Sequence, residues 1–384
     1  MRIDVQIAPA IINWIISQTQ LGELSQEVAN NLQAWKNGDK TPTFNQIENA
    51  SKATGIPLGY FFLQAPPVED RSLIECRTID SITVKNPSRD LMNTIHDMEM
   101  IQDWMREQLI ADGFDPLGYV GKSQTNAKAI AESVRKILDI DIDWYKKVTN
   151  GDSFGYIRNA ISESGVIVMA NGVVGSNTHR PLSVDEFRAF TIIDEYAPLI
   201  FINSNDSNGA KLFSLLHEFA HVCLGHNSFF NDRYSIGEKI SKTETVCNAV
   251  AAEIIIPQDL FVKAWNSAIG DNTEKQAITK LSSKFKCGTM VVARRALDNG
   301  FITFGVYKEL SQLAVKLYNE QRKKKSAGGD YYNTLSSRID KRFLCRLAAS
   351  VAEGKTLYED AYRFTNTNRN TFEKLINQGG ANNG

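Results

Sequence analysis

The spacing of apolar positions predicts that the N-terminal part of the chain is helical. Apolar residues recur at helical spacing over residues 11–15, 24–35 and 44–53, a pattern typical of amphipathic helices. A polar stretch with a glycine and a proline separates the second segment from the third and predicts a turn. Thr43 follows this turn and is suited to cap the third helix. The pattern therefore predicts a small helical domain over residues 1–66.

Farther along the chain, helical patterns give way to short apolar runs and then return. Helices are predicted over residues 127–138 and 153–164. Three short runs rich in apolar residues predict strands, at residues 165–170, 187–193 and 199–203. Helical patterns then continue to the C-terminal region. The order predicts an α+β fold that is mostly helical and contains a small sheet.

The most specific chemistry lies in the segment Phe213–His221, which reads FSLLHEFAH and contains His217-Glu218-x-x-His221. Two histidines four residues apart share one face of a helix and can bind one zinc ion, and the glutamate can accept a proton from the metal-bound water. The rest of this helix is apolar nearly all round, which indicates burial. Buried polar groups need partners, and a metal ion serves all three. The alternative is an amphipathic helix whose histidines share a face by chance.

A third metal ligand is expected downstream, in a helix that ends before a proline. Glu244 and Asn248 lie one turn apart on one face of this helix, whereas Glu253 points to the opposite side. We expect Glu244 to be the ligand and Asn248 to bond the ligand shell. Glu253 is the runner-up, or else a capping or salt-bridge residue. Cys223 and Cys247 are further potential ligands, although a cysteine is more often a small buried apolar residue.

In zinc peptidases of this layout, an edge strand holds the substrate backbone in extended form. Residues 187–193 are the candidate for that strand. His179 lies in a polar loop before it. We favour a solvated His179 over one that stabilises an oxyanion.

The sequence HEFAH, followed by E-x-x-x-N-A-V-A-A-E-I-I-I-P, resembles the ImmA/IrrE family of metallo-endopeptidases. The resemblance implies a zincin-like peptidase core in which His217, His221 and Glu244 bind the metal and Glu218 is the catalytic base. It also implies that the substrate is a specific protein, such as a repressor or an antitoxin. Zinc is the expected metal, with manganese as the alternative.

A passage from Trp35 to Phe44 resembles the end of the recognition helix in Cro/repressor-type helix-turn-helix domains. Gln26, Asn30 and Lys36 are the candidate DNA contacts there, because asparagine and glutamine can read adenines. The candidate recognition segment Gln26–Lys36 carries only one lysine, whereas phosphate contacts normally need several basic residues. A domain that binds a protein partner or packs on the peptidase is therefore the alternative.

Residues 272–302 give a second helix-turn-helix-like pattern, with a turn at Cys287 and a second helix that begins at Thr289. Arg294 and Arg295 on this second helix are candidate DNA contacts. Packing of the module against the catalytic domain is the equal alternative.

Composition limits the class of protein. The chain has 384 residues, 42% of them hydrophobic, and a formal net charge of -1, so any DNA contact must depend on a local basic face. Five scattered cysteines do not form a disulfide framework and indicate a reducing compartment. No segment predicts a signal peptide or a membrane span. We expect a cytoplasmic protein without membrane contact, and the sequence does not indicate its oligomeric state.

Together these patterns predict a zinc-dependent endopeptidase that cleaves a repressor or antitoxin and so controls genes of a mobile element or of a stress or phage response. The alternatives are a DNA-binding regulator with a structural metal site and one component of a toxin–antitoxin pair. The predicted domains are a helix-turn-helix domain at 1–66, a linker and long helix at 67–120, the metallopeptidase at 121–270, the second helix-turn-helix-like module at 271–305 and a helical region at 306–384.

Overall fold

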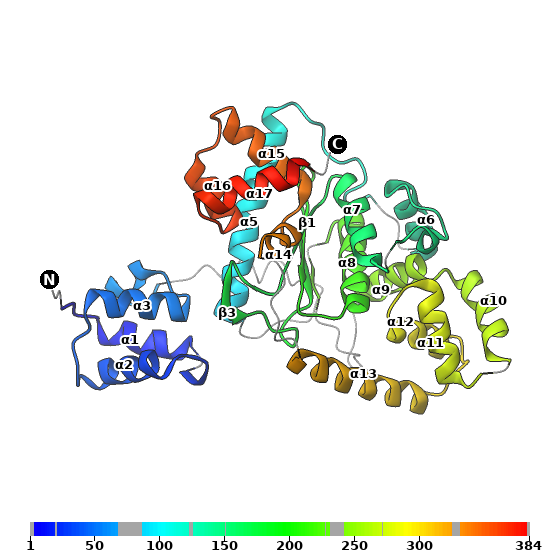
Figure 1. Ribbon diagram of the computed structural model, residues 1–384, viewed down its shortest axis with the longest axis horizontal. Coiled ribbons are helices and arrows are strands. Elements are labelled where there is room, and N and C mark those ends of the chain that lie inside the picture. Colours follow the sequence, from blue (N-terminus) through cyan, green and yellow to red (C-terminus); the bar gives the residue numbers. More distant parts are fainter. Residues whose placement is uncertain are drawn as a thin grey trace. The chain divides into compact units, whose positions relative to one another are not determined.

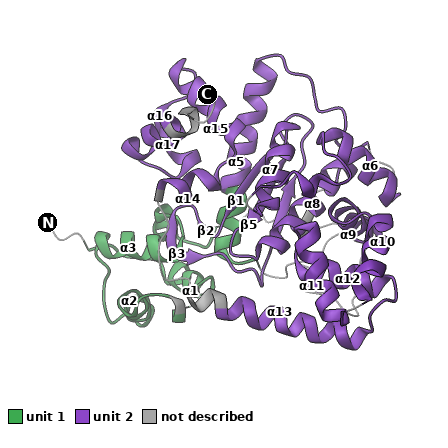
Figure 2. Cartoon of the chain, turned by 45° about the vertical axis from the view of Figure 1, so that its right-hand side comes forward, with its two compact units in different colours: residues 1–76, 84–96 green, residues 77–83, 97–384 purple. Residues whose placement is uncertain are grey.

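The computed structural model describes residues 4–19, 21–67, 87–122, 126–149, 151–226, 228–230, 242–270, 272–324 and 331–381. The chain divides into two compact units, residues 1–76 with 84–96 and residues 77–83 with 97–384 (Figure 2). Residues 68–86, in the predicted linker, lie outside the described residues.

The first unit is a small helical bundle. Its elements are α1 (Pro9–Ser17), the short η1 (Leu21–Glu23), α2 (Gln26–Asn37), α3 (Phe44–Thr54) and η2 (Leu58–Phe62). Thr43 caps α3 in a reciprocal pair of hydrogen bonds with Gln46, as expected of a capping box. Leu32 and Trp35 from α2 join the isoleucines of α1 in the core. The three predicted helices and the predicted cap are therefore present.

The second unit contains a small mixed sheet with the strand order β1-β5-β4-β6. The strands are β1 (Ile167–Asn171), β5 (Leu199–Asn203), β4 (Ala189–Ile192) and β6 (Ser228–Phe230). The pair β1 and β5 is parallel, and β4 is antiparallel to both of its neighbours. The predicted strand at 187–193 is therefore present, but β6 covers the edge that this strand was expected to leave open. A separate hairpin contains β2 (Val173–Val174) and β3 (Asn177–Pro181).

The outer edge of β1 is also covered. Val168 donates its backbone N–H to Asp340 at 3.1 Å, and its carbonyl accepts hydrogen bonds from the Arg158 guanidinium. Asp340 is at the same time the N-cap of α15, where it accepts a hydrogen bond from the N–H of Phe343. Side chains thus satisfy the backbone groups that an unpaired strand edge exposes.

One large core joins the sheet to the helices that carry the predicted metal site. The helices α6 (Ala127–Ile137), α7 (Ser153–Glu163), α8 (Asn208–Leu224) and α9 (Lys242–Ile255) contribute to it, together with the short η3 (Trp144–Lys146). The long α8 packs on β4 and β5 and against α9 (Figure 1). Its residues from Leu215 to Cys223 are all buried, as the apolar pattern predicted.

The next helices, α10 (Gln258–Ile269), α11 (Glu274–Phe285) and α12 (Thr289–Asp298), belong to the same core. A Cβ atom added to Gly209, at the start of α8, would lie 2.5 Å from the Cα of Gly288, so only glycine allows this approach. The predicted turn and the start at Thr289 are as expected. The boundary predicted at residue 270 does not coincide with a break in packing, because the second predicted module is part of the peptidase core.

The remaining helices belong to the second unit, except that the first turns of α5 lie in the first. They are α5 (Arg89–Ala111), α13 (Phe304–Lys324), α14 (Tyr331–Arg338), α15 (Lys341–Ala352), α16 (Tyr358–Thr365) and α17 (Arg369–Ala381). Within the described part of the chain, no single helix is long and apolar enough to cross a membrane. The pair α9 and α10 passes that test only together, with a bend of 59° between them, and both helices bury residues in the core.

Candidate metal centre

The two histidines of the motif lie on α8, whose ends are fixed by its sequence. Ser207 caps the N-terminus by accepting a hydrogen bond from the N–H of Ala210, and Gly225 ends the helix in the left-handed conformation with φ 75°. His217 and His221 lie one turn apart in between, and their exposed fractions are 0% and 1%. Helical spacing therefore directs both rings to one point inside the core.

Glu244, in the first turn of α9, reaches the same point. Its carboxylate oxygens lie 3.0 Å from His217 Nε2 and 3.2 Å from His221 Nε2. The two Nε2 atoms are 3.1 Å apart. Zinc bonds nitrogen at about 2.0–2.1 Å, so two ligand atoms of a tetrahedral site lie roughly 3.3 Å apart. The spacing of the three atoms is close to that of three tetrahedral ligands, and these residues form the one such cluster in the described residues.

The hydrogen bond at the far side of His217 explains why a cation fits among these atoms. His217 Nδ1 lies 3.0 Å from Asn248 Oδ1. Because that oxygen can only accept, Nδ1 carries a proton and the neutral ring has its lone pair on Nε2. This lone pair faces a carboxylate and a second imidazole nitrogen in a buried site. Acceptors that converge in this way repel one another unless a cation lies among them, so the ligand set suits a divalent metal.

The ionisation of the Glu244 carboxylate suits metal binding. Burial opposes its ionisation, but in the metal-free chain, where a proton can take the place of the cation between them, hydrogen bonds and charge interactions with His217 and His221 outweigh burial and lower its pKa to about 2. Glu244 is therefore an anion at neutral pH, which is the form that binds a metal.

Glu218, the expected catalytic base, has no exposed surface. Its Oε2 accepts a hydrogen bond from the hydroxyl of Thr191, which lies on β4 and is itself buried. Thr191 was not among the predicted site residues. Its only signal is its place within an apolar strand, and nothing in that pattern shows that this strand faces α8.

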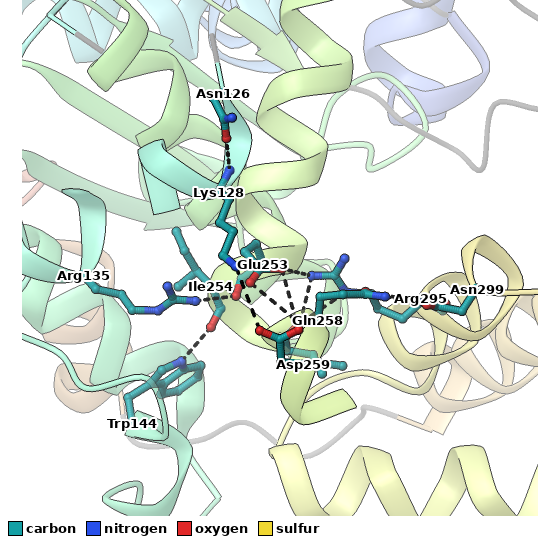
Figure 3. Close-up of polar contacts among 11 residues, drawn as sticks. Asn126, Lys128, Arg135, Trp144, Glu253, Ile254, Gln258, Asp259, Arg295 and Asn299 are labelled. Carbon is teal, nitrogen blue, oxygen red and sulfur yellow. Dashed lines mark hydrogen bonds and ion pairs between the residues drawn. The ribbon is translucent and has the colours of Figure 1, made fainter. Parts of the chain in front are cut away.

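The runner-up ligand Glu253 has a different role. Its side chain forms an ion pair with Arg295 at 2.7 Å and accepts a hydrogen bond from the N–H of Gln258 at the start of α10. Figure 3 shows this network, in which Arg135 and Trp144 also donate to the last carbonyls of α9. The expected capping and ion-pair roles of Glu253 are both present. The network satisfies helix-end carbonyls and fixes the helix that carries Glu244.

This network gives Arg295, a predicted DNA contact, a structural role in the protein. Its guanidinium also donates to the carbonyl of Ile256, and its side chain is 14% exposed. Contact with a phosphate would require Arg295 to leave the mostly buried carboxylate of Glu253. The neighbouring Arg294 is exposed and pairs with Asp298 on its own helix at 2.9 Å.

Among the described residues, neither His179 nor the two candidate cysteines belong to the metal cluster. Gln26 and Asn30 are exposed and bonded to each other at 3.0 Å on α2, and Lys36 is exposed in its last turn. His179 is exposed on strand β3, so the predicted loop is a hairpin strand. Cys223 and Cys247 are buried in the core, and burial raises the pKa of the Cys247 thiol, as expected of apolar packing residues.

Two family models match the chain. Residues 172–297 match a model of the M78 peptidases, described as an IrrE N-terminal-like domain. Residues 339–378 match a domain of unknown function, DUF8813. No curated protein matches the chain. The first match covers α8, α9 and the whole metal cluster, and neither covers the first unit. With its α+β fold, this segment of the chain therefore matches a metallopeptidase domain of the ImmA/IrrE type.

Proposed function

We propose that the chain is an endopeptidase in which His217, His221 and Glu244 hold a zinc ion and Glu218 is the base. The observation that carries this proposal is the convergence of three ligand atoms beside a buried carboxylate. When bound, the ion supplies Lewis acidity to the attacking water and to the scissile carbonyl. Manganese is the alternative metal.

Other residues of this chain have the remaining catalytic and positioning roles. Asn248 holds the His217 ring with its Nε2 lone pair toward the cluster. Glu218 accepts a proton from the attacking water and passes it to the leaving amine nitrogen, while the Thr191 hydroxyl orients its carboxylate. The apolar core around α8 excludes bulk water and so strengthens each of these electrostatic interactions.

The proposed substrate is a specific protein, a repressor or antitoxin whose cleavage changes the expression of genes under its control. Complete burial of Glu218 supports selectivity, because a peptide carbonyl reaches this base only after the surrounding chain rearranges. DNA remains a further proposed partner of the first unit, through the exposed Gln26, Asn30 and Lys36. A DNA affinity that does not fall with rising salt would contradict contact with phosphates.

The first test is elemental analysis of the purified protein for zinc and manganese. One metal ion per chain is expected, and loss of the metal in both His217→Ala and Glu244→Ala would establish the ligand set. Wild type that binds neither metal when supplied would remove the proposed chemistry and favour a regulator without catalysis.

The second test is cleavage of a co-encoded repressor. Glu218→Gln should abolish cleavage and retain the metal, because it removes the base and no ligand. The matched control is Glu132→Gln, the same change at an exposed glutamate on α6. Cleavage that survives Glu218→Gln would refute the mechanism.

A further inference from the structure

The strand nearest the catalytic base already carries a peptide segment along its outer edge. Residues Ser228–Phe230 of β6 pair antiparallel with Ala189–Thr191 of β4. Ser228 lies opposite Thr191, whose hydroxyl donates to Glu218. The same short strand also contacts α8, the helix of the motif. A piece of the chain's own backbone therefore runs beside the base in extended form.

An extended segment in this position is what an endopeptidase has to bind. The edge of a strand offers alternating N–H and C=O groups that pair with any peptide backbone, so an added strand supplies affinity with little dependence on sequence. In the four-stranded sheet, β5 occupies the inner edge of β4, so its outer edge is the side where a strand can add. That side is where β6 lies.

Burial of the catalytic groups is a second and independent observation. Glu218 and His217 have exposed fractions of 0%, and that of His221 is 1%. In this arrangement the base and the two histidines offer almost no surface to a substrate carbonyl, and only Glu244, with 13% of its side chain exposed, is partly accessible. Cleavage requires that some part of the covering chain moves away.

We propose that the outer edge of β4 binds an extended segment of the protein substrate and that β6 occupies this edge until such a segment replaces it. The proposal rests on the proposed peptidase function for its biological meaning, whereas the strand exchange itself is a binding event. The partner is an unfolded or extended segment of another protein. The chain in this conformation is latent, because its own strand holds the place of the substrate.

Competition with an internal strand makes the enzyme selective. A tethered segment competes at an effective concentration on the order of millimolar, so a short free peptide with weak affinity does not displace β6. A folded protein substrate with contacts beyond the strand does displace it, because those contacts add to the affinity of its extended segment. The exchange thus explains how an enzyme can be selective for one substrate although a strand edge pairs with any peptide backbone.

The test measures binding separately from cleavage. The probe is a fluorescein-labelled peptide with the sequence of residues 226–232, HNSFFND, and the protein is the zinc-loaded full chain in the Glu218→Gln background. Phe229→Pro disrupts the pairing with Phe190, because proline lacks the N–H and does not fit a paired strand. Fluorescence anisotropy should show that this variant binds the peptide at least about tenfold more tightly than the protein with intact β6, given the millimolar competitor that is lost.

Phe229→Val is the matched control, because it changes the same side chain and keeps a backbone that pairs, and it should bind as weakly as the parent. If Phe229→Pro does not fold or loses zinc, replacement of residues 228–230 by glycines weakens the strand without a proline. Equal affinity in the parent and the disrupted variants, or no binding to either, would overturn the proposal. Tight binding without any cleavage of a repressor by the Glu218-containing protein would instead reject the proposed peptidase function and leave the exchange standing.

Discussion

The hydrogen bond between Asn248 and His217 gives a prediction that needs no knowledge of the substrate. Asn248→Ala removes the acceptor that lies 3.0 Å from Nδ1 and leaves the buried ring without this partner. The ring then loses its fixed tautomer and orientation. Loss of such a partner behind a ligating histidine weakens metal binding by about 10–100-fold, which corresponds to about 1.4–2.7 kcal/mol. The same loss of binding energy should appear in the stability of the metal-loaded protein.

The assay is competition for zinc with a chromophoric chelator of known affinity. Asn248→Asp is the matched control, because a carboxylate keeps an acceptor toward the Nδ1–H, and it should bind zinc at least as tightly as wild type. Thr191→Val serves as a second control, since it touches the base and none of the three ligands. Equal zinc affinities for wild type and Asn248→Ala would refute the role assigned to this hydrogen bond and the tautomer inferred from it.

Three further predictions concern neighbouring groups. Thr191→Val should lower kcat by about 10–100-fold with metal content unchanged, because a hydrogen bond to a charged group contributes about 1.5–3 kcal/mol; rescue by Thr191→Ser checks the positioning role, and a full rate in the valine variant would exclude it. Arg295→Met should lower the free energy of unfolding in urea by about 1–3 kcal/mol, because it leaves the mostly buried Glu253 carboxylate without its ion-pair partner. Unchanged stability would contradict this structural role. In the metal-free protein the pKa of Glu244 is about 2 rather than 4.5, so the ionised carboxylate stabilises the fold above pH 4.5, and this stabilisation is lost as pH falls toward 2. In urea titrations at a series of pH values, Glu244→Gln should show a smaller decrease in the free energy of unfolding over this range. An identical decrease in wild type and variant would argue against the ionised carboxylate.

The candidate metal cluster could be predicted in part, because helix periodicity places His217 and His221 on one face, whereas the approach of Glu244 depends on the packing of α8 against α9. The nine residues between Glu244 and Glu253 showed that only one of them could face the histidines, and the ImmA/IrrE resemblance favoured Glu244. The structure places Glu244 within 3.2 Å of both rings and Glu253 in an ion pair. Within each helix, the sequence spacing was sufficient to predict which side chains share a face.

Contacts between residues far apart in the sequence were missed. Thr191 meets Glu218 only because β4 packs on α8, and a strand of apolar residues gives no sign of that neighbour. Arg295 was assigned to DNA because its charge is visible in the sequence, whereas its partner 42 positions earlier is not. The short β6 was not predicted, since three residues are too few for an alternating pattern. Because β6 pairs with β4, the strand that was expected to bind substrate along an open edge has that edge covered.

The burial of α8 explains both the strong electrostatic interactions in the candidate metal centre and the lack of exposed surface there. The side chains around the motif are apolar and have almost no exposed surface, so the field of a bound cation and that of the Glu244 carboxylate act in a medium of low dielectric constant. In the described part of the chain, the same packing leaves Glu218 without exposed surface. An open cleft would admit peptides but would expose the ligands to water and weaken their interaction with the metal. A strand that covers β4 and can be replaced satisfies both requirements, because a substrate segment in its place restores the cover while it delivers a carbonyl to Glu218.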